Sequence, residues 1–124
     1  MLQGKMVAPT LPAKDLDRAV AFYRDTLGLS VEEQRADGTV FTAGEGTRFL
    51  VYPTEYAGTA KNTAMAFRVD DAVQEVKELK AKGVQFLDFD SGPIKTTDGV
   101  AEIEGIKGGW FTDTEGNIVA VFEQ

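Results

Sequence analysis

The sequence contains no cysteine and no histidine. Without cysteine there is no disulfide framework and no thiolate nucleophile. Without histidine the commonest general base and metal ligand is missing, and Ser-His-Asp and Cys-His catalytic sets are excluded. No apolar run approaches the roughly 20 residues that a membrane-spanning helix needs. The first ten residues, MLQGKMVAPT, lack the apolar core of a signal peptide. We therefore expect a cytoplasmic protein with no membrane partner.

Basic residues are also scarce, since 13 Lys and Arg face 20 Asp and Glu and leave a net charge of −7. Nucleic-acid binding depends on neutralising phosphates with Lys and Arg, so the charge argues against a nucleic-acid partner. It favours a cationic ligand, or it serves only to keep the protein soluble. The length of 124 residues predicts one compact domain over 1–124.

Two stretches far apart in the sequence repeat each other. Residues 41–52 read FTAGEGTRFLVY and residues 111–122 read FTDTEGNIVAVF. Both begin Phe-Thr, both place Glu-Gly at the fifth and sixth positions, and both continue into an apolar strand. Such self-similarity at a distance predicts an internal duplication.

Two helical patterns support the duplication. Residues 14–29 carry apolar side chains at helical spacing, with Asp15 as the expected cap, and a glycine follows the pattern. Residues 69–84 show the same arrangement, with Asp70 and Asp71 near the start.

Each half of the chain then predicts a strand, a helix and three strands. The expected fold class is α+β, with two tandem βαβββ modules at about 1–54 and 62–124 and a linker at 55–61. The second half contains an insertion of about 15 residues within 88–105, which is either a lid or a simple loop. The expected strands are 5–11, 29–35, 38–44, 47–54, 62–69, 84–88, 106–112 and 117–123.

Alternation along the strands separates two kinds of surface. One face is wholly apolar and should pack under the helices: Phe49, Val51, Met65, Phe67, Val119 and Val121. The other mixes small, aromatic and cationic side chains: Arg48, Leu50, Tyr52, Ala64, Ala66, Arg68, Ile118, Ala120 and Phe122. This mixture is typical of a concave ligand-binding surface. Arg48 and Arg68 either anchor an anionic or carbonyl group or form surface salt bridges.

Three further side chains are candidates for the site. Trp110 either stacks on a flat ligand or packs at the sheet edge. Glu102 and Glu104 fall in an expected loop, where they form part of a lid, are solvated, or supply a general base without a metal.

The segments DLDRAVAFYRDTLGL (15–29) and FTDTEGNIVAVFE (111–123) give the chain a specific likeness. The sequence resembles the vicinal oxygen chelate superfamily of glyoxalase I, bleomycin resistance proteins and extradiol dioxygenases. The resemblance covers nearly the whole chain. It implies two modules whose sheets form a cup, often completed across a dimer. In metal-dependent members, four His, Glu or Gln side chains hold a divalent ion in the cup.

The resemblance also locates those four metal-ligand positions. In this chain they are Ala8, Leu50, Ala64 and Ala120. None of these side chains has an oxygen or nitrogen atom to donate to a metal. We therefore expect no metal and no other cofactor, although the fold is retained.

The segment MVAPTLPA carries two prolines in the expected first strand, and proline favours edge strands. It resembles the bleomycin-binding branch, in which the first strand is exchanged between subunits. The resemblance therefore implies a homodimer. That branch binds a cationic drug, which agrees with the net charge but not with two arginines in the cup.

The sequence favours a metal-independent homodimeric protein that sequesters a planar or apolar small molecule, such as an antibiotic. An alternative is a metal-free isomerase or lyase with a loop carboxylate as base, and a third is a protein–protein interaction module. The expected ligand-binding residues are Arg48, Leu50, Tyr52, Ala64, Ala66, Arg68, Trp110, Ala120 and Phe122.

Overall fold

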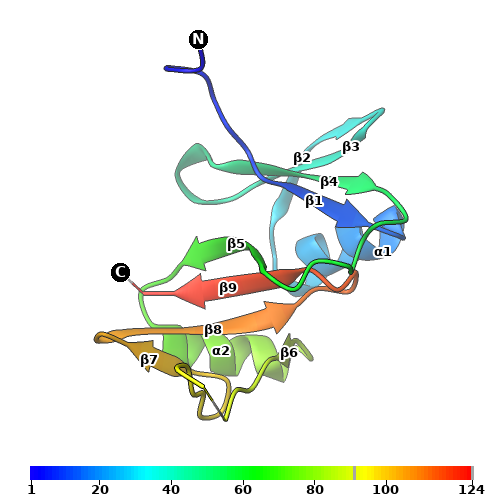
Figure 1. Cartoon of the computed structure of the whole chain (residues 1–124). Coiled ribbons are helices and arrows are strands. Elements are labelled where there is room, and N and C mark those ends of the chain that lie inside the picture. Colours follow the sequence, from blue (N-terminus) through cyan, green and yellow to red (C-terminus); the bar gives the residue numbers. More distant parts are fainter. Residues whose placement is uncertain (91, 124) are drawn as a thin grey trace.

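Two β-sheets, one from each half of the chain, form the framework of the computed structural model, which describes residues 1–90 and 92–123 (Figure 1). The first sheet has the order β1-β4-β3-β2 and the second β5-β9-β8-β6, with β7 also paired to β8. The β1–β4 and β5–β9 pairs are parallel and the others antiparallel. The strands are β1 (Thr10–Ala13), β2 (Ser30–Arg35), β3 (Gly38–Thr42), β4 (Arg48–Pro53), β5 (Thr63–Arg68), β6 (Gln85–Phe86), β7 (Ala101–Ile103), β8 (Ile106–Thr112) and β9 (Ile118–Phe122).

The two halves share one topology, which confirms the predicted α+β fold with two βαβββ units. In each half the first strand pairs with the last, and the last pairs with the one before it. Helix α1 (Leu16–Ala21) with the π-helical turn η1 (Phe22–Thr26) occupies the place in the first half that α2 (Ala72–Ala81) occupies in the second. A short 3-10 turn, η2 (Gly44–Gly46), precedes β4.

The helices are shorter than predicted, and each begins at an aspartate cap. The Asp15 side chain accepts a hydrogen bond from the Arg18 backbone N–H, and Asp71, not Asp70, accepts one from the Gln74 N–H. Gly28, which follows the first helix, is thirteen positions after Asp15, whereas Gly83, which follows α2, is twelve positions after Asp71. The π-helical turn takes up this extra residue, because it spans one residue more per hydrogen bond than an α-helix.

The first strand begins later than predicted. Residues 1–9 form no strand and extend away from the sheets as an exposed arm (Figure 1). Pro12 lies within β1. Because β1 is an edge strand that pairs only with β4, the missing backbone N–H of proline is tolerated there. Strand β6 is also shorter than the predicted 84–88.

The expected insertion is partly structured. Residues 101–103 form β7, which pairs with β8, so Glu102 lies in a strand and not in the loop predicted for it. Ser91, inside the predicted 88–105 segment, lies outside the described residues, as does Gln124.

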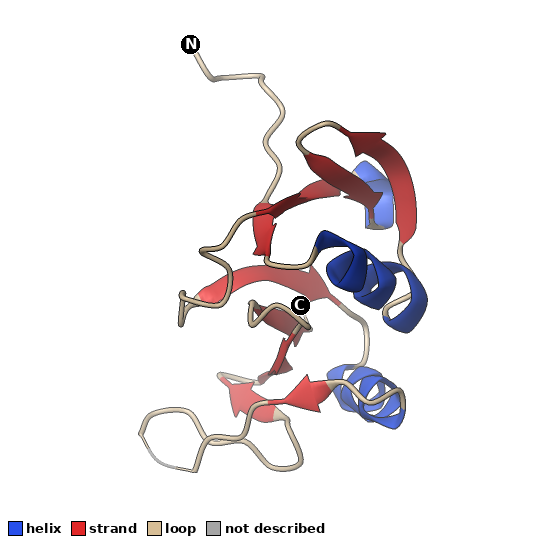
Figure 2. Cartoon of the chain, turned by 90° about the vertical axis from the view of Figure 1, so that its right-hand side faces the viewer, coloured by secondary structure: helices blue, strands red, loops and turns tan. Residues whose placement is uncertain are grey.

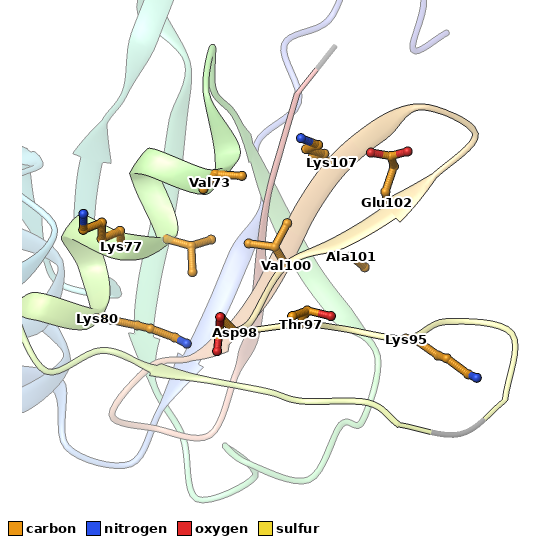
Figure 3. Close-up of a pocket in the computed structure, with 11 residues that line it drawn as sticks. Val73, Lys77, Lys80, Lys95, Thr97, Asp98, Val100, Ala101, Glu102 and Lys107 are labelled. Carbon is orange, nitrogen blue, oxygen red and sulfur yellow. The ribbon is translucent and has the colours of Figure 1, made fainter.

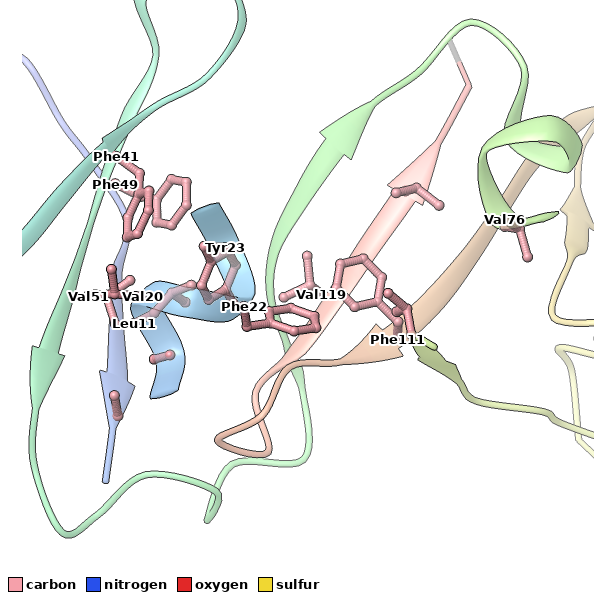
Figure 4. Close-up of a cluster of buried hydrophobic side chains, with 14 residues drawn as sticks. Leu11, Val20, Phe22, Tyr23, Phe41, Phe49, Val51, Val76, Phe111 and Val119 are labelled. Carbon is pink, nitrogen blue, oxygen red and sulfur yellow. The ribbon is translucent and has the colours of Figure 1, made fainter. Parts of the chain in front are cut away.

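An apolar core joins the two halves, with both helices on the same side of the sheets (Figure 2). Tyr23 contacts Phe41 and Phe49 of the first sheet with ring centroids 5.8 and 5.4 Å apart, and Phe22 reaches Phe111 of the second at 6.4 Å (Figure 4). Burying each such side chain stabilises the fold by about 1.5–3 kcal/mol. The predicted apolar face is confirmed, with these residues in the core or packed against it: Phe49, Val51, Met65, Phe67, Val119 and Val121.

Candidate functional site

Five of the nine predicted ligand-binding residues share one face of the second sheet. Ala66, Ala120 and Trp110 lie side by side across β5, β9 and β8, and Arg68 lies beside Phe122 in the next row. A sixth, Ala64, precedes Ala66 on β5 at a register shift between Thr63 and Met65, so it lies outside the regular pairing. Because side chains alternate along a strand, this face is opposite the one that Val119 and Val121 present to the core.

The face combines small residues with aromatic borders. Ala64, Ala66 and Arg68 are exposed, whereas Trp110 and Phe122 are half-buried. Short side chains at Ala66 and Ala120, next to the large aromatic side chains of Trp110 and Phe122, leave room for a flat group to lie on the sheet. We refer to the five residues that share this face as the alanine face.

The β7–β8 hairpin closes one end of the alanine face. Together with Trp110, Ala120 and Phe122 it lines an open cavity of about 220 Å³. Phe89, from the inserted segment, packs edge-on against Trp110 with ring centroids 5.7 Å apart. The inserted segment therefore extends the aromatic border of this end.

The other three predicted residues, Arg48, Leu50 and Tyr52, lie on β4 of the first sheet. The Arg48 Nε donates to Glu32 Oε2 at 2.6 Å, and this hydrogen bond raises the pKa of Arg48. A bulge between Val31 and Glu33 places Glu32 outside the regular pairing. Of the two interpretations of Arg48, the structure shows the salt bridge.

The two sets of residues approach each other beside the N-terminal arm. Arg48 of β4 and Ala66 of β5 both line a groove of about 500 Å³, together with Ala8 of the arm. Leu50 and Tyr52 lie on the same strand as Arg48 but do not line this groove. Within one chain the nine residues are thus divided between two sheets that meet at the arm.

The four positions at which the resemblance places a metal do not suit a cation here. Ala8 is on the arm, Leu50 on β4, Ala64 on β5 and Ala120 on β9. Their side chains are hydrocarbons, and a divalent ion requires oxygen, nitrogen or sulfur ligands. In residues 1–90 and 92–123 no three Asp or Glu side chains gather into a potential metal site. The residues present do not fit the metal of the metal-dependent members.

The two candidate carboxylates lie at different places. Glu102, on β7, lines a cavity beside α2. Glu104 occupies the turn after β7 with a positive φ of 51° and lines the 220 Å³ cavity with Trp110 and Phe122. Only Glu104 of this pair adjoins the alanine face.

A buried polar network that the sequence did not predict ties the last hairpin to the first helix. Glu115 Oε1 accepts hydrogen bonds from the backbone N–H groups of Lys14 and Asp15, both at 2.9 Å. Arg18 donates from Nε to Glu115 Oε2 at 2.8 Å and from Nη2 to Oε1 at 3.0 Å. Burial alone would raise the pKa of Glu115, but these donors outweigh it and lower the pKa to about 2.

Asp113 extends the network from the same turn. It accepts from the hydroxyl of Tyr23 at 2.6 Å and from the backbone N–H groups of Glu115 and Asn117. The Asn117 amide donates to Asp113 and to the carbonyl of Pro12. Burial, followed by the charge of Asp113, raises the pKa of Tyr23. The Tyr23 hydroxyl thus stays protonated as a donor.

The Asp-x-Glu-Gly-Asn motif is therefore structural in this chain. Glu123, at the end of the same segment, accepts from the backbone N–H of Ala72 and so supports the start of α2. The sequence signal was the fixed spacing of these residues, which indicated the family but not the partners of each side chain. Both helices begin against a glutamate from the last hairpin.

Solved structures with the same fold come from several kinds of protein. A bleomycin-binding protein complexed with bleomycin superposes with a TM-score of 0.71 at 19% identity, over 97% of this chain and 98% of that one. The fosfomycin resistance protein FosX from Listeria monocytogenes gives 0.71 at 16%, over 98% and 93%. A lactoylglutathione lyase from Agrobacterium tumefaciens gives 0.66 at 23%, over 97% and 93%. At these identities the likeness shows the fold.

Sequence comparison supplies the family. No curated protein matches the chain. No helix in the part of the chain that the structure describes is long and apolar enough to cross a membrane. The family model of the Glyoxalase/Bleomycin resistance protein/Dioxygenase superfamily matches residues 5–121. With the duplicated βαβββ topology, this match shows that the chain belongs to that superfamily.

Proposed function

We propose that the protein binds a planar, largely apolar small molecule on the alanine face without a metal. The observation that carries the proposal is the row of Ala66, Ala120 and Trp110 across β5, β9 and β8, with Phe122 in the adjacent row on β9. An alanine floor is shallow, and aromatic rings favour stacked or edge-on contact with a flat ligand. Arg68, beside Phe122 in that adjacent row, is placed to contact a polar group of the ligand.

A second copy of the chain would complete the site. The N-terminal arm is exposed and apolar, with Met6 at 83% and Val7 at 94% exposure. Apolar side chains of this kind become buried when an arm packs on a partner subunit. In such a homodimer Leu50 and Tyr52 of one subunit would face the alanine face of the other. The bleomycin-binding neighbour, which holds bleomycin on this fold, supports a sequestering role.

The experiment uses the single tryptophan, because Trp110 lies at the proposed site and its fluorescence reports on binding there. Untagged protein is titrated with a panel of planar aromatic compounds and with bleomycin. We expect saturable quenching by members of this panel, and the variant Phe122→Ala should weaken binding about tenfold or more through lost stacking.

Tyr56→Ala is the matched control, since Tyr56 is an aromatic residue that is 73% exposed in the linker. It should leave the affinity unchanged. If Phe122→Ala lowers the stability of the protein but leaves the affinity unchanged, Phe122 is a packing residue and the alanine face is not the binding site. Binding of a partner protein without any small-molecule ligand would favour the interaction module.

One observation favours a second candidate function, a metal-free isomerase or lyase. Glu104 lines the same cavity as Trp110 and Phe122, so its carboxylate could remove a proton from a molecule bound there. The test is turnover of any ligand found in the panel. If turnover occurs and Glu104→Gln abolishes it while binding remains, the protein is an enzyme with Glu104 as its base. Glu102→Gln is the control, because Glu102 lies outside this cavity.

A further inference from the structure

A second cavity lies on the opposite side of the second sheet from the alanine face. It has a volume of about 660 Å³ and is formed by α2, the inserted segment and the β7–β8 hairpin (Figure 3). Val76 and Ala101, which are almost fully buried, form part of its floor. Gly109 lies under α2, since a Cβ there would come within 3.3 Å of Val76. Trp110, the next residue along β8, therefore points away from this cavity.

The charge of the cavity is opposite to that of the chain. Four lysines, Lys77, Lys80, Lys95 and Lys107, line it together with two carboxylates, Asp98 and Glu102, which leaves a formal charge of +2. The whole chain carries −7. In residues 1–90 and 92–123 every ion pair involves an arginine, so none of the four ammonium groups is paired with a carboxylate. Within the described part of the chain, the four lysines of this cavity thus form no ion pair with a carboxylate.

The inserted segment forms an ordered wall of this cavity. The Asp88 carboxylate accepts from the Thr96 hydroxyl and from the Gly99 N–H, both at 3.2 Å. Thr97 and Val100 exchange backbone hydrogen bonds at 2.8 and 3.0 Å. These bonds fix a tight turn whose two central residues have positive φ. The first half of the chain has no counterpart of this segment, so the cavity is specific to the second half.

Lys80 connects α2 to that wall. A Cβ at Gly99 would lie 3.2 Å from its Cε and 3.3 Å from its Nζ, so the side chain runs across the glycine. Figure 3 shows it extending from α2 toward the turn that carries Asp98. The exposed Lys80 side chain thus lies beside this turn, with its ammonium group at the cavity.

We propose that this cavity is a binding site for a small organic anion. Val73, Val76 and Val100, which we call the valine floor, receive the apolar body, and the lysines receive a phosphate or carboxylate group. An apolar floor with a few converging charged groups is the usual composition of a small-molecule site. Ammonium groups attract phosphate and carboxylate strongly because both partners are charged. The site lies across the second sheet from the alanine face, although Ala101 and Lys107 also line the 220 Å³ cavity there, and it does not depend on the function proposed for that face.

The probe is phenyl phosphate, titrated into ¹⁵N-labelled full-length protein and followed by amide chemical shifts. We expect saturable shifts in the second half of α2 and in residues 96–100, and little change at Trp110. Inorganic phosphate tests the charged group alone, and benzylamine tests the same ring with a positive charge. We expect inorganic phosphate to bind more weakly and benzylamine to leave these amides unshifted.

The variant Lys77→Glu/Lys80→Glu should weaken phenyl phosphate binding at least about tenfold, because it reverses two charges at the site. Lys5→Glu/Lys61→Glu is the matched control, since it changes the net charge equally but outside the cavity. If the first variant unfolds, Lys77→Gln/Lys80→Gln replaces it and should weaken binding in the same direction.

Three results would overturn the proposal. The first is equal weakening by the matched control, which would reduce the effect to overall charge. The second is binding of benzylamine to the same amides as tightly as phenyl phosphate. The third is equal affinity for inorganic phosphate and phenyl phosphate, which would remove any role for the valine floor.

Discussion

The two Glu-Gly turns, 43–47 and 113–117, share a sequence pattern but not a role. In the first turn Glu45 is exposed, and the bonds at 43–47 stay within the turn, from Ala43 to Thr47 and from Thr47 to Gly44. In the second turn Glu115 is buried and bonded to the start of α1. The same dipeptide is a local turn in one half and a contact between halves in the other.

Two neighbouring positions explain the difference. Where the second turn has Asp113 and Asn117, the first has Ala43 and Thr47. Asp113 accepts the N–H groups of its own turn and the hydroxyl of Tyr23, which orients the turn toward the first half. Ala43 offers no such acceptor, so the first turn lines the groove beside the arm. A duplicated segment can thus keep its backbone turn while one copy gains a tertiary role.

The largest predicted effect separates the two glutamates. Glu115→Gln should lower the free energy of unfolding by about 3 kcal/mol, because it removes a buried charge that satisfies Arg18 and two backbone N–H groups. Glu45→Gln, the matched control, should change it by less than about 0.5 kcal/mol. Urea unfolding measures both. Equal effects would mean that the network does not distinguish the turns.

The pH dependence of the unfolding free energy should also reveal the role of Glu115. The pKa of Glu115 falls from 4.5 to about 2 on folding, so the stability it contributes is present above about pH 4.5 and declines as the pH falls toward 2. At pH 3 the wild type should have lost about 2 kcal/mol of this contribution. The unfolding free energy of Glu115→Gln should fall less between pH 6 and pH 3 than that of the wild type. Parallel profiles would contradict the assignment.

Removing the Tyr23 hydroxyl should have a smaller effect. Tyr23→Phe leaves the aromatic packing in place but deprives buried Asp113 of one donor, at a cost of about 1–2 kcal/mol. Tyr52→Phe is the control, because Tyr52 lies on β4 outside this network. Thermal unfolding at neutral pH should show a lower midpoint for Tyr23→Phe only.

The smallest predicted effect is the difference in stability between alanine substitutions at the glycines of the two turns. Gly46 and Gly116 both have positive φ, so alanine at either position should cost about 1 kcal/mol. A Cβ at Gly116 would also lie 3.0 Å from the Cα of Gly58 in the linker, whereas Gly46 has open space around it. We therefore expect Gly116→Ala to be the more destabilising by roughly 0.5–1 kcal/mol in chemical denaturation. If Gly46→Ala were the more destabilising variant, the linker at Gly58 would be able to move aside for the added methyl group.

Hydrophobic periodicity, helix-capping residues and turn glycines in the sequence predicted most of the fold. Alternation placed Phe49 and Val119 on the core face, and caps and glycines located both helices, because these signals are local. Strand β7 and the shortened β6 were not predicted, since their pairing with β8 depends on a tertiary neighbour. The late start of β1 has the same cause, because its bounds depend on pairing with β4, and only Thr10–Ala13 have ladder partners there.

The candidate site was predicted only in part. Strand alternation predicted that Ala66, Arg68, Ala120 and Phe122 share a face, because β5 and β9 pair in register over these residues. It could not show that Arg48 is paired with Glu32, since that contact depends on a bulge. Nor could it show the lysine-lined cavity, whose four cations come from a helix, a loop and a strand that are separated in sequence.

The bond between Arg18 and Glu115, 97 positions apart, bears on how the chain folds during synthesis. The first helix leaves the ribosome well before the carboxylate that bonds to its N-terminus is made. Until then Tyr23 lacks its hydrogen-bond partner and Phe22 lacks Phe111. The first half therefore keeps part of its apolar surface uncovered until residues 111–115 have been made. Its dependence on chaperones should be greatest at that stage of translation.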